Sequence, residues 1–190
     1  TGQIVKDVGQ TASADLGLVF PISERLQYSL GFGASTKYYN DAHDLDEAIL
    51  LASAGFARAI GNRTLLSATA YLMDYPVGHA PYLTSWGVIP KVTYAFNPRW
   101  SFVGTYLYES DHYPTAGTYD GPLWDYGAEL HFRPYDDREN SIKAGYHTGV
   151  IGPRDPKEHY TYDRWVMGLD VDFARRMHLD MELTLEDRLF

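Results

Sequence analysis

The sequence predicts an all-β fold, an antiparallel up-and-down transmembrane β-barrel, on three observations. Apolar and polar residues alternate through about ten segments of strand length. Aromatic residues make up 15% of the 190 residues and the mean hydropathy is -0.32, a composition typical of strands with one apolar and one polar face. No run approaches the roughly 18 to 20 consecutive apolar residues that a membrane-spanning helix needs. We expect residues 1–190 to form a single barrel domain.

Residues 160–173 show the alternation most clearly. In an extended strand the side chains from Trp165 to Phe173 at odd positions share an apolar face, and Arg164, Asp170 and Asp172 lie on the other face. The two rings that end the apolar face are eight residues apart. That spacing is roughly 26 Å along a strand, or near 20 Å of height at a tilt of about 40°. The apolar face is therefore about as tall as the apolar band of an outer-membrane barrel.

The remaining strands follow from the same period of two. The expected ranges are 12–20, 27–37, 48–60, 66–72, 85–96, 101–109, 124–133, 142–150, 160–173 and 179–186. The content of Ala and Leu in 48–60 would also permit a helix, but the Gly61-Asn62-Arg63 turn that follows favours a hairpin. Pro90 predicts a bulge or a local loss of pairing. We expect a loop around Pro76, Gly78 and Pro81, with short connections after odd strands and long ones after even strands.

Alternation alone fits both a soluble barrel with an apolar interior and a membrane barrel with the opposite sense. Three features favour the membrane barrel. Glycines and charges share the polar register, the connections alternate in length, and aromatic residues bracket the apolar face of several strands. The predicted lipid-facing aromatic girdle consists of Trp86, Phe96, Trp124, Phe132, Trp165 and Phe173.

Charged residues of both signs are predicted to face the lumen. They are Lys37, Lys91, Asp125, Glu129, Arg133, Lys143, Asp170, Asp172, Asp180, Glu182 and Glu186. In a conduit they would form a transverse field that orients a polar solute. In a barrel that closes at about ten strands they would instead form a salt-bridged plug. The sequence leaves both interpretations open.

The ends of the chain raise the question of barrel size. If the short turns are periplasmic, the first strand descends and the tenth ascends, which places both termini outside the cell. Phe190 also falls in the polar register of its strand. One interpretation is that the sequence is a section of a larger barrel of twelve or more strands. The other is that loop length does not indicate which side of the membrane a connection lies on. No signal peptide is recognisable at the N-terminus.

Composition excludes several classes of function. The net charge of -9, without a cluster of Lys and Arg, argues against nucleic-acid binding. The absence of cysteine excludes disulfides, thiolate metal sites and cysteine nucleophiles. No cofactor and no metal site are predicted: the acidic residues Asp41, Asp44, Asp46 and Glu47 lack the ligand order of a calcium loop, and a solvated loop is expected.

Three pairs of neighbouring acid and histidine are the candidates for catalysis. They are Asp111 with His112, Glu158 with His159, and His43 with Asp44. Adjacent residues on a strand point to opposite faces, so sequence neighbours are poor candidates for proton transfer. We expect no catalytic residues, and these side chains are predicted to be solvated.

The pattern from residue 12 onward resembles the bacterial outer-membrane β-barrel superfamily, which implies the outer membrane of a Gram-negative cell. Tyr162-Asp163-Arg164-Trp165 and the segment 183–188 are also similar to the barrels that follow tetratricopeptide domains in surface-lipoprotein and exopolysaccharide export proteins. That resemblance implies a periplasmic export partner, and the superfamily implies contact with outer-membrane lipid and lipopolysaccharide. The resemblance to the superfamily says little about activity.

The sequence therefore predicts a pore or export conduit for a polar solute or polymer. Two alternatives remain open. One is a barrel hydrolase that resembles omptin proteases or lipid A deacylases, with a His/acid site at the rim. The other is a structural or adhesive barrel that acts through its extracellular loops.

Overall fold

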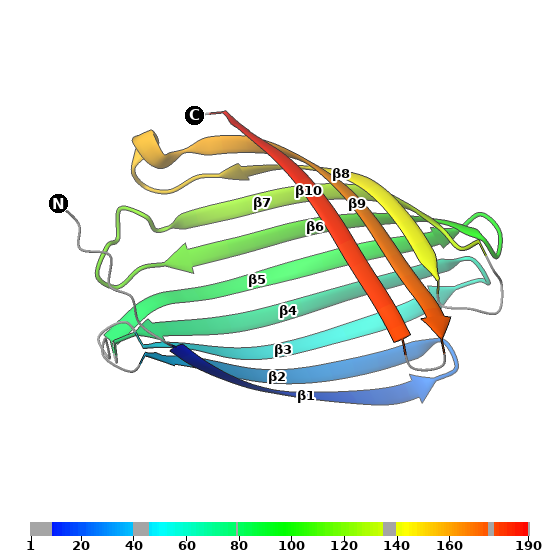
Figure 1. Cartoon of the computed structure of the whole chain (residues 1–190), viewed down its shortest axis with the longest axis horizontal. Helices are drawn as coiled ribbons and strands as arrows, with labels where there is room; N and C mark the ends of the chain where they lie inside the picture. The colour runs from blue at the N-terminus through cyan, green and yellow to red at the C-terminus, as the bar shows by residue number, and fades with distance from the viewer. Residues whose placement is uncertain (1–8, 40–45, 79, 135–139, 175–176, 190) are drawn as a thin grey trace.

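The computed structural model describes residues 9–39, 46–78, 80–134, 140–174 and 177–189, and the side chains of residues 172–178 lie outside this description. Its ten strands form one antiparallel sheet in which each strand pairs with its neighbours in the chain (Figure 1). The strands are β1(Gly9–Ser23), β2(Leu26–Tyr39), β3(Glu47–Ile60), β4(Thr64–Val77), β5(Ala80–Ala95), β6(Trp100–His112), β7(Gly121–Phe132), β8(Ser141–Ile151), β9(Tyr160–Ala174) and β10(Met177–Leu189). A short 3-10 helix, η2(Pro156–Glu158), precedes β9.

The predicted fold class is confirmed. Each of the ten expected segments is a strand, and most of the strands extend a few residues beyond the predicted limits. The ambiguous segment 48–60 is strand β3, which pairs along its length with β2 and β4. Among the described residues, no helix has the length and apolar character needed to span a membrane.

The predicted loop around Pro76 is wrong. β4 continues to Val77 and β5 begins at Ala80, so the connection is short and passes through Gly78, which has a φ of 55°. Pro76 pairs with Pro81 across a register shift that follows Tyr75. Proline is tolerated there because the strands end at this point and require few further N–H donors. The expected alternation of short and long connections therefore fails between β4 and β5.

Pro90 interrupts pairing on one side of β5 only. The ladder to β4 is continuous through Pro90, whereas the ladder to β6 has no pairs between Val88 and Lys91 and resumes in the same register. A proline without an N–H can accept this loss without a change of register. The local loss of pairing predicted from the sequence is confirmed.

The two faces of the sheet differ in the sense expected of a membrane barrel. Apolar side chains such as Leu72 and Trp165 are 62% and 57% exposed, whereas Asp125 and Ser85 on the polar face are 4% and 0% exposed. In Figure 1 the sheet is strongly curved, and β9 and β10 cross over the other strands. The polar face is therefore the inner, crowded face, and the apolar face is the outer one. This distribution is the reverse of that in a soluble barrel.

The described sheet is open. β1 pairs with β2 and β10 pairs with β9, and no pairing joins β1 to β10 in the described part of the chain. The sheet therefore has two long edge strands.

Candidate functional site on the inner polar face

A repeated arrangement of three side chains on three adjacent strands organises the inner face. A donor side chain on one strand crosses a glycine on the next strand and reaches a carboxylate on the third. We call this arrangement a glycine-bridged rung. The three rungs are Tyr71–Gly87–Glu109 on β4, β5 and β6, Tyr162–Gly149–Asp125 on β9, β8 and β7, and Lys143–Gly168–Glu182 on β8, β9 and β10.

The glycines of these rungs are required by close approach. A Cβ added at Gly87 would lie 2.6 Å from the ring of Tyr71, and one at Gly149 would lie 2.4 Å from the ring of Tyr162. At Gly168 it would lie 2.3 Å from Lys143 Cε. The long donor side chains therefore lie flat on the backbone of the middle strand, an arrangement known for aromatic side chains that cover glycines in sheets. This explains the glycine at these three positions of the polar register.

Asp125 is the centre of a network across β7, β8 and β9. Its carboxylate accepts hydrogen bonds from the Tyr162 hydroxyl at 2.5 Å and from the Arg164 guanidinium at 3.0 Å. The Nδ1 atom of His147 lies 2.9 Å from the other oxygen. A buried carboxylate with a cation and two further polar partners has its charge balanced and its lone pairs satisfied.

His147 links Asp125 to Glu129. Its Nε2 atom lies 3.3 Å from Glu129 Oε1, and Glu129 Oε2 lies 2.8 Å from His131 Nε2. Each ring nitrogen of His147 therefore has a carboxylate oxygen within hydrogen-bond distance. Since both nitrogens of His147 face carboxylates, neither is positioned to accept a proton from a substrate.

The predicted lumen-facing residues divide into two groups. Asp125, Glu129, Lys143 and Glu182 are joined in the network and the Lys143 rung, together with the unpredicted residues His147, Tyr162 and Arg164. The other predicted lumen residues with described side chains take no part in these hydrogen bonds. They are Lys37 on β2, Lys91 on β5, Arg133 just after β7, Asp170 on β9, and Asp180 and Glu186 on β10. Asp172 is outside the described side chains.

Two carboxylates on β6 have only neutral hydrogen-bond partners among the residues that the structure describes. Glu109 accepts from the hydroxyl of Tyr71, and Asp111 accepts from Ser85 Oγ, which is fully buried. In the described part of the chain neither carboxylate forms an ion pair, in contrast to Asp125, which pairs with Arg164. The strand predicted from the sequence ends at Glu109, and neither Glu109 nor Asp111 is among the predicted lumen residues, although both acids are in the polar register.

A row of tyrosines lies at the end of the sheet next to these carboxylates. The rings of Tyr75 and Tyr82 are 5.7 Å apart, as are those of Tyr82 and Tyr113, and Tyr119 follows at 6.0 Å from Tyr113. All three contacts are edge-to-face, the geometry that aromatic quadrupoles favour. Tyr75 also donates to Glu47 Oε2 at 3.0 Å.

Asp120 connects the two long loops on the same side. It accepts from the backbone N–H of Tyr113 at 2.6 Å, lies 3.0 Å from His112 Nδ1, and lies 3.6 Å from Arg154. The N–H of Tyr113, followed by the hydrogen bond to His112, lowers the pKa of Asp120 below its ordinary value. His112 is thus placed against Asp120, and its predicted neighbour Asp111 bonds to Ser85 instead.

The other predicted pairs and the acidic loop have different outcomes. Glu158 and His159 are exposed at the end of η2. His43, Asp44 and Asp41 lie outside the described residues. The expectation of a solvated loop is wrong for Asp46, which is buried and accepts from the N–H of Tyr39 at 2.8 Å. Glu47 accepts from Tyr39 and Tyr75.

The predicted girdle residues lie on the outer face or at its margins. Trp86 and Trp124 both pack against Tyr108, with ring centroids 5.3 Å and 6.1 Å apart. Near the opposite ends of the strands, Phe132 packs on Trp100 and Phe96 packs on Tyr94. Trp165 packs on Tyr146. Phe173 is outside the described side chains.

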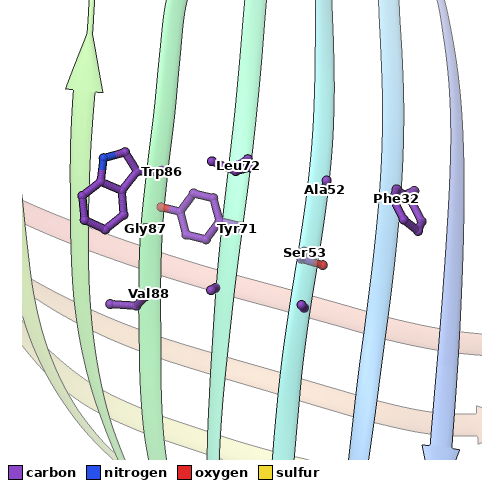
Figure 2. A pocket seen from close by; sticks show the side chains of 10 residues that line it. Phe32, Ala52, Ser53, Tyr71, Leu72, Trp86, Gly87 and Val88 are labelled. Atoms are coloured by element: carbon purple, nitrogen blue, oxygen red, sulfur yellow. The ribbon is translucent and has the colours of Figure 1, made fainter.

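Between these rings the outer face is hollowed. A shallow pocket of about 400 Å³ is lined by Phe32, Ala52, Leu72, Trp86 and Val88 with other small residues (Figure 2). Figure 2 shows the large side chains around the small residue Ala52, with other strands behind the sheet. The hollow is apolar and belongs to the outer surface.

No protein-family model and no curated protein matches this sequence. The fold is similar to a solved structure, the siderophore receptor PirA from Pseudomonas aeruginosa, with a TM-score of 0.51 and 12% identity. The match covers 95% of this chain and 36% of the receptor, so the chain spans about a third of the receptor's length. At this identity the likeness supports the fold, an up-and-down β-barrel sheet, which is the coarser part of the resemblance predicted from the sequence.

Proposed function

We propose that the chain forms the wall of an outer-membrane β-barrel of a Gram-negative cell and that this barrel conducts a polar solute. One observation carries the proposal: the apolar side chains are exposed on the outer face, and hydrogen-bonded polar side chains crowd the inner face. Such a sheet is unstable in water and suited to hydrocarbon outside and water inside. The aromatic clusters near the ends of the outer face would lie at the two membrane interfaces, in contact with lipid and lipopolysaccharide.

The proposal includes pairing of both sheet edges in the membrane. Unpaired backbone groups in hydrocarbon cost several kcal/mol each, so long edges such as β1 and β10 cannot face lipid. The similarity to a barrel of a receptor supports a wall of this kind. Polymer export and a periplasmic export partner stay predictions from sequence, as does the charged plug.

Conductance across planar lipid bilayers tests the proposal. The full chain is refolded into lipid and added to a bilayer in potassium chloride. We expect stepwise currents that vary linearly with voltage. Stable insertion without current would contradict the conduit and favour a structural barrel.

A further inference from the structure

A strip at one end of the sheet combines a tyrosine row with two carboxylates that have no ion-pair partner among the described residues. It is formed by Tyr75, Tyr82 and Tyr113 at the end of the sheet and by Asp111 and Glu109 on β6. Tyr82 is 45% exposed, so ring surface is available to a ligand. The strip therefore offers both an aromatic surface and negative charge.

The carboxylates of the strip act electrostatically on the tyrosine row. Burial, followed by the carboxylate of Asp111, raises the pKa of the Tyr113 phenol above its ordinary value, and Tyr82, Glu109 and Asp120 act in the same direction. Asp111 and Glu109 each accept a hydrogen bond from a neutral hydroxyl, and neither has an ion-pair partner among the described residues. The network around Asp125, by comparison, contains the Arg164 guanidinium.

The chain itself holds a cation by the same chemistry nearby. The Lys37 ammonium lies 4.7 Å from the centroid of the Tyr39 ring, and the Tyr39 hydroxyl donates to Glu47 Oε1. A ring face attracts a cation through its quadrupole. Tyr75, which shares Glu47 with Tyr39, begins the tyrosine row of the strip.

We propose that this strip binds organic ammonium ions, the chemical class of amines and quaternary ammonium compounds. The tyrosine rings contact the methyl or methylene groups around the nitrogen, and Asp111 and Glu109 balance its charge. A neutral ligand of equal shape gains the ring contacts without the charge interaction. The inference rests on the proposed function only in that the strip faces an aqueous lumen.

Calorimetric titration of the full chain in detergent micelles tests the proposal without any need for conduction. The probes are choline and 3,3-dimethyl-1-butanol, in which a carbon replaces the ammonium nitrogen. We expect saturable binding of choline and binding of the neutral probe weaker by about tenfold or more. Equal binding of the two probes, or no binding of choline, would overturn the proposal.

Variants locate the site. Glu109→Gln and Asp111→Asn keep acceptors for Tyr71 and Ser85 while removing charge, and their combination is expected to weaken choline binding about tenfold. Tyr82→Leu removes one ring and is expected to weaken it severalfold. Glu186→Gln, which removes a carboxylate from β10, is the matched control and should bind choline as the original chain does. Retained binding in the double variant would place the site elsewhere and contradict the assignment.

This test separates the two proposals. Choline binding without conductance would support the strip and contradict the conduit. Conductance without choline binding would support the conduit and contradict the ammonium-binding strip.

Discussion

The hydroxyl of Tyr162 on β9 reaches Asp125 on β7, 2.5 Å away, because its ring crosses Gly149 on the strand between them. The three residues stand opposite one another across three strands, as do Tyr71, Gly87 and Glu109. The inner face is thus held together by side chains that span three strands each, in addition to the backbone ladders. This adds a second, side-chain layer of cross-linking to the wall.

The glycine of a rung should not tolerate a methyl group. Gly149→Ala places a Cβ 2.4 Å from the Tyr162 ring, so the ring must move and its bond to Asp125 is lost. We expect the free energy of unfolding to fall by about 1 to 3 kcal/mol. Urea unfolding of the chain in lipid vesicles, followed by tryptophan fluorescence, measures this change.

Gly17→Ala on β1 is the matched control, because nothing lies within 4 Å of the added Cβ. It should leave stability unchanged or raise it by up to about 1 kcal/mol, since alanine restricts the unfolded chain. Equal effects of the two substitutions would show that the Tyr162 rung contributes nothing.

Loss of the Asp125 carboxylate should be among the most damaging changes on the inner face. Asp125→Leu leaves the Arg164 guanidinium without its counter-charge and removes the hydrogen-bond partner of His147 Nδ1, and we expect a loss of about 3 to 5 kcal/mol in the same unfolding measurement. Asp180→Leu removes an exposed carboxylate from β10 and should cost less than about 1 kcal/mol. Similar small losses in both variants would contradict the central place of Asp125.

The contact between the two long loops should depend on pH through Asp120. Its pKa in the folded loop is lower than its ordinary value of 3.8, so its carboxylate stabilises the loop above that ordinary value. This stabilisation is lost as the pH falls through the lowered folded pKa.

Hydrogen exchange of the Tyr113 amide, which donates to Asp120, reports on that contact. Protection relative to the intrinsic exchange rate should fall as the pH drops below about pH 4. In Asp120→Asn the charge is absent, and protection should be lower and independent of pH in this range. A decline in the original chain that persists in the variant would assign the dependence to another group.

The sequence predicts the strands and their faces well because both depend on a local period of two. Trp165 and Arg164 are adjacent, and their opposite directions need no knowledge of neighbouring strands. The sense of the faces also followed from sequence, since glycines such as Gly149 and Gly168 gather with the charges. Pro76 misled the prediction because a register shift allows it to pair with Pro81 at the strand ends.

The contacts of the inner face could not be predicted because they depend on register between strands. Nothing in the sequence aligns Tyr162 with Gly149 and Asp125, which are separated by more than 10 residues at each step. His112 likewise contacts Asp120 across a loop, and its sequence neighbour Asp111 points the other way. A one-residue slip would reverse every such assignment.

The orientation of the two faces is tested most directly by single cysteines, which the cysteine-free sequence makes straightforward. Leu72→Cys and Met73→Cys place a thiol on opposite faces of β4, where Leu72 is 62% exposed. Each variant, spin-labelled and inserted in lipid vesicles, is examined for relaxation by oxygen, which concentrates in hydrocarbon, and by a water-soluble nickel complex. We expect oxygen to dominate at position 72 and the nickel complex to dominate at position 73. The reverse pattern, or water at both positions, would contradict a membrane barrel with its apolar face in lipid.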